Sequence, residues 1–166
     1  MARPGRNSSP ENILNPARTF FTTTKTSMAR GLLQTERNAG LLIDVLRSLV
    51  AEFAFELHDF VIMPDHLHLL FTIDDGMTVE KAMQLVKGRF SFRLGREFEF
   101  KGEVWQKGFS EVQVLGDESF KEHRVYIANN PVKAGLVDSP QKYAYCFESL
   151  ARKKTETQRV HVAQEV

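Results

Sequence analysis

The strongest constraint on the fold is the order in which strand-like and helix-like segments alternate along the chain. Residues 19–24 are β-branched and aromatic, which is typical of a strand. Residues 36–53 carry apolar side chains at spacings of three and four, which predicts an amphipathic helix. Residues 55–63 and 66–73 follow as two strands, and the Pro64-Asp65 turn between them predicts a tight hairpin.

The second half of the chain continues this alternation. Thr78 can cap a helix whose apolar positions lie at 82, 85, 86 and 90. Residues 104–115 are Gly-interrupted and β-rich, which predicts one more strand. A last helix is predicted over 118–129, with Asp117 or Ser119 as its cap and Asn130-Pro131 as its end. The order β-α-β-β-α-β-α indicates an α+β fold, an antiparallel sheet with helices packed on it, close to a ferredoxin-like split βαβ arrangement.

Length and composition set the limits of this fold. A chain of 166 residues, 42% of them hydrophobic, suits one domain with a real core. We expect that domain at 17–150, a flexible N-terminal tail at 1–16 and a polar, mobile C-terminal tail at 151–166. The single cysteine excludes an internal disulfide framework, and no apolar run reaches the roughly 18 residues of a membrane span. These features predict a soluble cytoplasmic protein.

Charge is distributed unevenly, although the formal net charge is only +1. Residues 1–37 hold six basic and two acidic side chains, whereas residues 44–80 hold one basic and eight acidic ones. Residues 87–107 hold six basic against three acidic side chains, and residues 151–159 hold four against one. The near-zero total argues against a uniformly basic nucleic-acid binder. Two interpretations of the uneven charge remain: a local basic face that binds nucleic acid, or an ordinary solvated surface.

The sharpest local feature is the pair His66 and His68 in the second hairpin strand. Residues two apart in a strand point to the same face, so the imidazoles would stand side by side while Leu67 turns into the core. Two such rings form half of a divalent-metal site, but two ordinary strand histidines fit the pattern as well. The candidates for further ligands are acidic or amide side chains: Asp65, Asp74, Asp75, Glu111, Asn129 and Asn130.

A second feature is the segment that begins at Tyr126. Tyr126 and Asn130 are four residues apart, so a helix would place them on one face. An amide oxygen there could complete a metal site, and the phenol could attack a phosphodiester. Without further evidence, the same residues can also be explained as a tyrosine of the core, Tyr126, and an ordinary helix end at Asn130-Pro131.

Three segments in this order resemble the HUH single-tyrosine transposases of the insertion-sequence-200 type, and most closely the branch called REP-associated tyrosine transposases. HUH denotes two histidines around a hydrophobic residue, and REP a repetitive extragenic palindrome. The matching segments are Met63-Pro64-Asp65-His66-Leu67-His68-Leu69-Leu70, Val104-Trp105-Gln106-Lys107-Gly108-Phe109 and Tyr126-Ile127-Ala128-Asn129-Asn130-Pro131-Val132-Lys133-Ala134-Gly135-Leu136-Val137. The resemblance covers about residues 17–150.

The resemblance implies the HUH endonuclease fold and a chemistry. His66, His68 and Asn130 would bind a divalent ion, Mg²⁺ or Mn²⁺, and Tyr126 would be the nucleophile. The family attacks single-stranded DNA beside a hairpin, forms a 5′-phosphotyrosine link and releases a 3′-hydroxyl, and a second strand end can reverse the step. No ATP is needed, and the chain carries no P-loop signature. Relatives are monomers or homodimers, and both states stay open.

The family's DNA contacts map onto two basic regions of this chain. The candidates in the N-terminal strand region and in the helix that Thr78 caps are Arg18, Lys25, Arg30, Lys87, Arg89, Arg93 and Arg96. Phenylalanines interleave with them at 90, 92, 98 and 100 and could stack unpaired bases, although core packing explains most of the 13 Phe. Two places depart from the usual family pattern: Ala128 replaces a polar residue, and Ser110-Glu111 stands where relatives often carry a polar or aromatic residue followed by Asp.

Two rival hypotheses remain open. One is a catalytically silent, regulatory protein that binds hairpin DNA with the same fold; the intact set of His66, His68, Asn130 and Tyr126 argues against it. The other is an unrelated metal hydrolase that uses the two histidines and a carboxylate. A covalent protein–DNA adduct separates the transposase hypothesis from both.

Overall fold

The computed structural model describes residues 17–148 and 150. The predicted tails, 1–16 and 151–166, lie outside these residues. The elements follow the predicted order: β1 (Arg18–Lys25), α2 (Glu36–Ala51), β2 (Glu56–Ile62), β3 (His66–Ile73), α3 (Val79–Phe98), β4 (Ser110–Val114) and α4 (Gly116–Lys133). Short 3-10 turns lie at Ser27–Ala29 (η1) and Pro140–Lys142 (η2). Among the described residues, no helix is long and apolar enough to cross a membrane.

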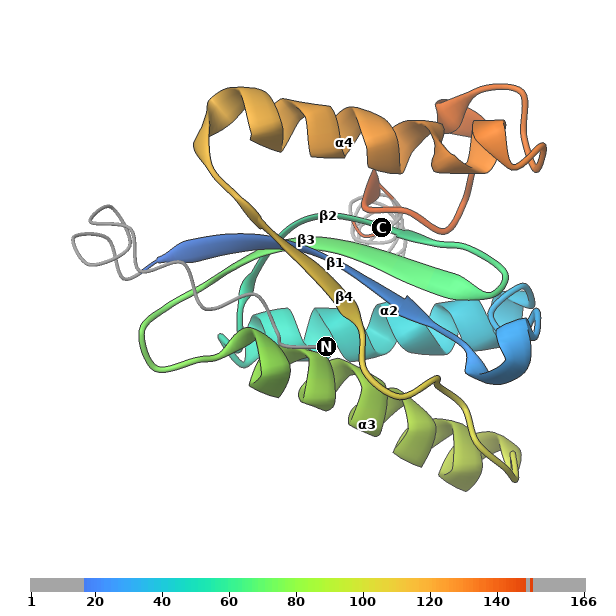
Figure 1. Ribbon diagram of the computed structural model, residues 1–166. Helices are drawn as coiled ribbons and strands as arrows, with labels where there is room; N and C mark the ends of the chain where they lie inside the picture. Colours follow the sequence, from blue (N-terminus) through green and yellow to red (C-terminus); the bar gives the residue numbers. More distant parts are fainter. Residues whose placement is uncertain (1–16, 149, 151–166) are drawn as a thin grey trace, which may run out of the picture.

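The four strands form one antiparallel sheet in the order β2-β3-β1-β4. This is the arrangement of a ferredoxin-like split βαβ fold, so the predicted fold class is confirmed. Helices α2 and α3 cover one face of the sheet and α4 covers the other (Figure 1). Because side chains alternate along a strand, each face of the sheet builds its own core.

The larger core lies between the sheet and the helices α2 and α3. It takes Leu67, Leu69 and Phe71 from β3, while Leu42 and Leu46 come from α2. A smaller core lies under α4 and takes Leu70 from β3 and Ile127 from the helix. The two histidines of β3 therefore belong to the α4 face, since they alternate with Leu67 and Leu69.

Leu46→Ala should destabilise the fold by about 3 kcal/mol, because it leaves a cavity in the larger core. The side chain is completely buried. Phe53→Ala is the control, since Phe53 is 94% exposed and its loss should change the free energy of unfolding by less than about 0.5 kcal/mol. Urea unfolding measures both values, and equal effects of the two variants would contradict this placement of the core.

The N-termini of two helices agree with the sequence pattern. Thr78 caps α3 by accepting a hydrogen bond from the backbone N–H of Lys81 at 3.1 Å, as predicted. Thr35 caps α2 in the same way through the N–H of Asn38. α2 ends at Ala51, two residues before the predicted boundary.

The last strand is shorter than predicted. β4 covers only 110–114, and the preceding segment is irregular apart from a single bridge between Trp105 and Thr26. The Trp105 side chain is buried: its indole N–H donates to the carbonyl of Lys87 at 3.0 Å and its ring packs on Phe90. Trp105 is thus a core residue.

The prediction for the last helix was wrong at both ends. α4 begins at Gly116, after an N-cap position, Leu115, that makes no side-chain cap bond; the acidic Asp117 and Glu118 lie in its first turn. The helix also continues through Asn130 and Pro131 to Lys133. Proline lacks an N–H donor, and its ring clashes with the carbonyl of the residue four positions before it, so it usually bends or ends a helix. Because Pro131 lies in the last turn and is buried beside Ile127 on the sheet side, the helix passes it before ending.

Candidate active site

The β2–β3 hairpin holds the two histidines at one end of the sheet. Its turn is closed by the N–H of Met63, which donates to the carbonyl of His66 at 2.8 Å. The neighbouring loop clamps the turn from outside: Thr26 donates its N–H to the carbonyl of Asp65, and Leu33 donates to that of Pro64, both at 2.9 Å. This turn is therefore anchored at both of its residues, and His66 begins β3 in a fixed position.

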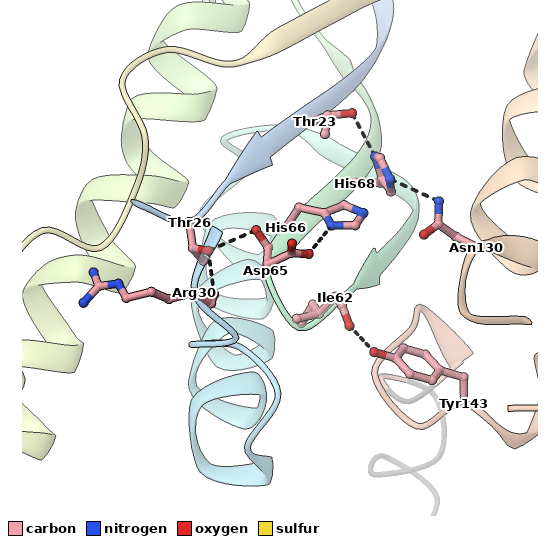
Figure 2. Close-up of polar contacts among 9 residues, drawn as sticks. All are labelled: Thr23, Thr26, Arg30, Ile62, Asp65, His66, His68, Asn130 and Tyr143. Atoms are coloured by element: carbon pink, nitrogen blue, oxygen red, sulfur yellow. Dashed lines mark hydrogen bonds and ion pairs between the residues drawn. The ribbon is translucent and has the colours of Figure 1, made fainter. Parts of the chain in front are cut away.

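His66 and His68 lie side by side on the α4 face, as the alternation of β3 predicted. Their ring centroids are 4.7 Å apart and the planes are nearly perpendicular. His66 Nδ1 lies 2.7 Å from a carboxylate oxygen of Asp65, and His68 Nδ1 lies 2.8 Å from the hydroxyl of Thr23 (Figure 2). In each ring, the remaining nitrogen is Nε2.

Helix α4 brings Tyr126 and Asn130 over this pair. The amide nitrogen of Asn130 is 3.3 Å from Nε2 of His68 (Figure 2), and the rings of Tyr126 and His68 have centroids 5.5 Å apart. Tyr126 remains 47% exposed, so its phenol is accessible to a large substrate. Since α4 is continuous through Asn130, the two side chains stand one helical turn apart on the same face, as their spacing requires.

Phe21 on β1 forms the floor of the site. Its ring stacks on His68 at 5.3 Å and meets the edge of Tyr126 at 5.8 Å. It also contacts His123, one turn before Tyr126 on α4. Neither Phe21 nor Thr23 stood out in the sequence, because only the pairing register of β1 with β3 places them beside His68.

His68 stays neutral over the ordinary pH range. Only 4% of the residue is exposed, and burial, followed by the charge of His66, lowers the pKa of His68 to about 3. A neutral imidazole keeps one nitrogen lone pair. The buried ring can therefore accept a hydrogen bond or bind a cation through that lone pair, because it does not take up a second proton at neutral pH.

The donor set suits a divalent cation of the Mg²⁺ or Mn²⁺ type. Within residues 17–148 and 150, no group of three His, Cys, Asp or Glu is placed to hold a metal ion. The third group beside the imidazoles is instead an amide, that of Asn130. Half a turn about its last bond presents the amide oxygen to the same point, and water can fill the remaining positions.

The other acidic candidates lie elsewhere. Glu111 is opposite Thr22 in the β1–β4 ladder, on the face that α2 and α3 cover, so it faces away from the histidines. Asp74 and Asp75 follow the far end of β3, about 25 Å along the strand from His66. Of the acidic candidates for a metal ligand, only Asp65 lies beside the histidines, where its carboxylate contacts His66.

The predicted DNA contacts separate into two groups. Lys25 is the cross-strand neighbour of His66 and is exposed, and Arg30 follows in the adjacent loop, where it donates to the carbonyls of Ser27 and Glu103. Arg18 is at the opposite end of β1, paired with Ile73. Of the N-terminal group, the structure thus brings only Lys25 beside the histidines, because the Arg30 side chain extends away from them (Figure 2).

The basic residues of α3 lie on the other side of the sheet, and several of them already form ion pairs or hydrogen bonds within the protein. Arg89 makes a bidentate ion pair with Glu52 at 2.8 and 3.0 Å, and Arg93 makes another with Glu97 at 2.7 and 3.1 Å. Lys87 donates to the carbonyls at 106 and 108. Arg96 lies over the ring of Phe92, which is exposed.

Comparisons with known proteins show which family the chain resembles. The family model "Transposase IS200 like" matches residues 21–130, about two thirds of the chain. The chain is 31% identical over 103 residues to a protein of Haemophilus influenzae assigned as a REP-associated tyrosine transposase. It is 26% identical over 119 residues to the REP-associated tyrosine transposase of Escherichia coli. These alignments cover 56% and 71% of this chain, and 58% and 68% of the two relatives.

Solved structures show the same fold. A REP-associated tyrosine transposase bound to a REP hairpin superposes with a TM-score of 0.69 at 23% identity, over 92% of this chain and 87% of the other. A protein of Deinococcus radiodurans assigned as a transposase gives a TM-score of 0.52 at 20% identity, over 77% and 97%. The motifs around His66 and Tyr126, the fold and the family match agree, and the chain belongs to the IS200-like transposase family.

Proposed function

We propose that this protein is a metal-dependent enzyme that cuts and rejoins single-stranded DNA beside a REP-like hairpin, with Tyr126 as its nucleophile. The convergence of two elements at one end of the sheet carries the proposal. The hairpin strand β3 supplies His66 and His68, and α4 supplies Tyr126 and Asn130 within contact of His68. We assign this activity to one domain, residues 17–150.

The chain's own residues divide the chemistry between them. The phenol oxygen of Tyr126 attacks phosphorus, the new bond joins the enzyme to the 5′ side of the break, and the bond from phosphorus to the 3′ oxygen breaks. The phenol proton passes to water, and the leaving 3′ oxygen takes a proton from water. A divalent ion held by His66, His68 and Asn130 would polarise a non-bridging phosphate oxygen and so make phosphorus more electrophilic.

Rejoining follows from the same arrangement. The phosphotyrosine link keeps the energy of the original phosphodiester, so a 3′-hydroxyl can attack it and release Tyr126. The exposed position of the phenol leaves room for this second strand end. The hairpin itself is proposed as the partner because a REP hairpin is bound in the relative with the same fold.

The test uses the full chain, a single-stranded oligonucleotide with a REP-like hairpin and flanks, and Mn²⁺ or Mg²⁺. A band of the mass of protein plus DNA on a denaturing gel, lost when EDTA is added, supports the proposal. Tight hairpin binding without any adduct across flanking sequences would favour the catalytically silent DNA-binding protein. Release of DNA fragments without an adduct would favour the metal hydrolase.

Lys25 should contribute a phosphate contact near the cut, because its side chain is exposed directly beside His66. Lys25→Ala should weaken hairpin-DNA binding and reduce the slope of log K against log salt by about 0.7 to 0.9. Arg89→Ala is the matched control, since Glu52 already binds that guanidinium. A salt series of fluorescence anisotropy titrations measures both slopes, and an equal loss in the two variants would contradict the placement.

A further inference from the structure

We propose that Asp65 and Thr23 are positioning residues that set the tautomers of His66 and His68, so that both rings present an unprotonated Nε2 to Asn130 and the space before it. The inference rests on the metal-binding role proposed for this pair. A histidine can bind a cation only through a nitrogen that carries no proton. The hydrogen-bond partner of Nδ1 therefore decides whether Nε2 is free of a proton and able to bind the ion.

For His66, the partner is the carboxylate of Asp65. An ionised carboxylate only accepts hydrogen bonds, so the Nδ1 atom 2.7 Å from it must carry the proton. In the neutral ring this leaves the lone pair on Nε2. Neighbours in a strand normally point to opposite faces, but Asp65 is in the turn before β3, which allows its side chain to reach the ring of the next residue (Figure 2).

The backbone of Asp65 is fixed independently of its side chain. Its carbonyl accepts the N–H of Thr26 at 2.9 Å and faces the hydroxyl of the same residue at 3.1 Å (Figure 2). Thr26 is fully buried. The carboxylate is thus aimed at His66 by an anchored turn, which lowers the entropy cost of keeping the bond.

For His68, the tautomer follows from two contacts. In the amide orientation of this structure, the Asn130 nitrogen faces Nε2 of His68 at 3.3 Å; an amide nitrogen only donates, so in this orientation Nε2 accepts and carries no proton. The ring proton is therefore on Nδ1, which donates to the Thr23 hydroxyl at 2.8 Å. Thr23 is directly opposite His68 in the β1–β3 ladder, and the ring lies flat on Phe21.

The two partners differ in chemistry, which gives the inference a distinct signature. The Asp65 carboxylate is charged and can only accept a hydrogen bond from Nδ1–H of His66. The Thr23 hydroxyl is neutral and could also donate a hydrogen bond to Nδ1 of His68. Asp65→Asn keeps the shape of the side chain but adds an amide donor toward Nδ1, which favours the wrong tautomer of His66. The Asn variant should therefore be at least as defective as Asp65→Ala, although it is the more conservative change.

The first measurement is the affinity of the full chain for Mn²⁺ alone, by calorimetry. Asp65→Asn and Thr23→Val should each weaken it about 10- to 100-fold. Thr23→Ser, which keeps the hydroxyl, should bind like the wild type. Asp74→Asn is the matched control for lost charge, because it removes a carboxylate at the far end of β3 and should leave the affinity unchanged. Circular dichroism checks that every variant is folded.

The second measurement needs no metal or DNA. Long-range ¹⁵N–¹H NMR of the metal-free protein, with the imidazoles neutral, should show Nδ1–H in both rings. Asp65→Asn should shift His66 toward Nε2–H and leave His68 unchanged, and Thr23→Val should do the reverse. Wild-type Mn²⁺ affinity and Nδ1–H tautomers in both variants would overturn the inference. Nε2–H in either ring of the wild type would overturn it as well; in His68 this tautomer would follow from an Asn130 amide turned the other way.

These results are separate from the test of the proposed function. Nδ1–H tautomers that depend on Asp65 and Thr23 would support the inference even if no covalent adduct with DNA ever formed. Adduct formation together with an Nε2–H tautomer of His66 in the wild type would overturn it and leave the function standing.

Discussion

Tyr126→Phe is expected to abolish DNA cleavage while hairpin binding stays within about twofold of the wild type. The substitution removes one oxygen, the proposed nucleophile, and keeps the ring that packs against Phe21 and His68. Loss of a nucleophile costs at least about 10³-fold in rate, so neither product nor adduct should be detected. A labelled hairpin oligonucleotide, followed on native and denaturing gels, reports binding and cleavage separately.

Tyr145→Phe is the matched control for this variant. It makes the same chemical change in a tyrosine that packs against Tyr143, on the C-terminal segment that follows η2. This variant should cleave like the wild type. Cleavage that persists in Tyr126→Phe would exclude Tyr126 as the nucleophile, and cleavage lost equally in both variants would indicate damage to the fold.

His68→Ala should lower the affinity for Mn²⁺ at least about 100-fold and stop cleavage. Loss of an outer partner of a metal ligand alone costs about 10- to 100-fold, so loss of the ligand should cost no less. The neutral state of His68, which burial enforces, means that no drop in pH within the usual assay range should mimic this variant through that ring. Calorimetry with Mn²⁺ measures the affinity, and the denaturing gel measures cleavage.

His58→Ala is the corresponding control. His58 is on the same face of the sheet, but its Nε2 atom bonds to the Thr72 hydroxyl at 2.6 Å and its ring packs on Phe120, away from the site. It should keep the Mn²⁺ affinity of the wild type. Unchanged affinity in His68→Ala would contradict the proposed metal site.

The sequence correctly predicted those elements whose local residue pattern matches the side chains that the structure buries. The amphipathic spacing of α2, the hairpin turn at Pro64-Asp65 and the Thr78 cap each follow from a few neighbouring residues, and all are present. The alternation of β3 correctly placed His66 and His68 on one face. Local rules failed at Pro131, where burial against the sheet outweighs the usual stop signal, and within 104–109, which is irregular rather than a strand.

The partners of the histidines depend on information that the sequence does not hold locally. Thr23 reaches His68 only because β1 pairs with β3 in one particular register, and Glu111 faces away because β4 pairs with β1 in another. The ion pair between Arg89 and Glu52 also depends on tertiary packing, because the two residues are 37 positions apart in the sequence. The pair between Arg93 and Glu97 is local, since the two residues are one turn apart on α3. A count of basic residues therefore could not say which of them remain available to DNA.

The most direct test of the proposed nucleophile is the chemical location of the covalent link. The adduct, digested with nuclease and then trypsin, should yield the peptide of residues 125–133, bounded by Arg124 and Lys133, which contains Tyr126 as its sole tyrosine. Tandem mass spectrometry should place a 5′-linked nucleotide phosphate on Tyr126. A phosphate on any other residue of the protein would contradict this account.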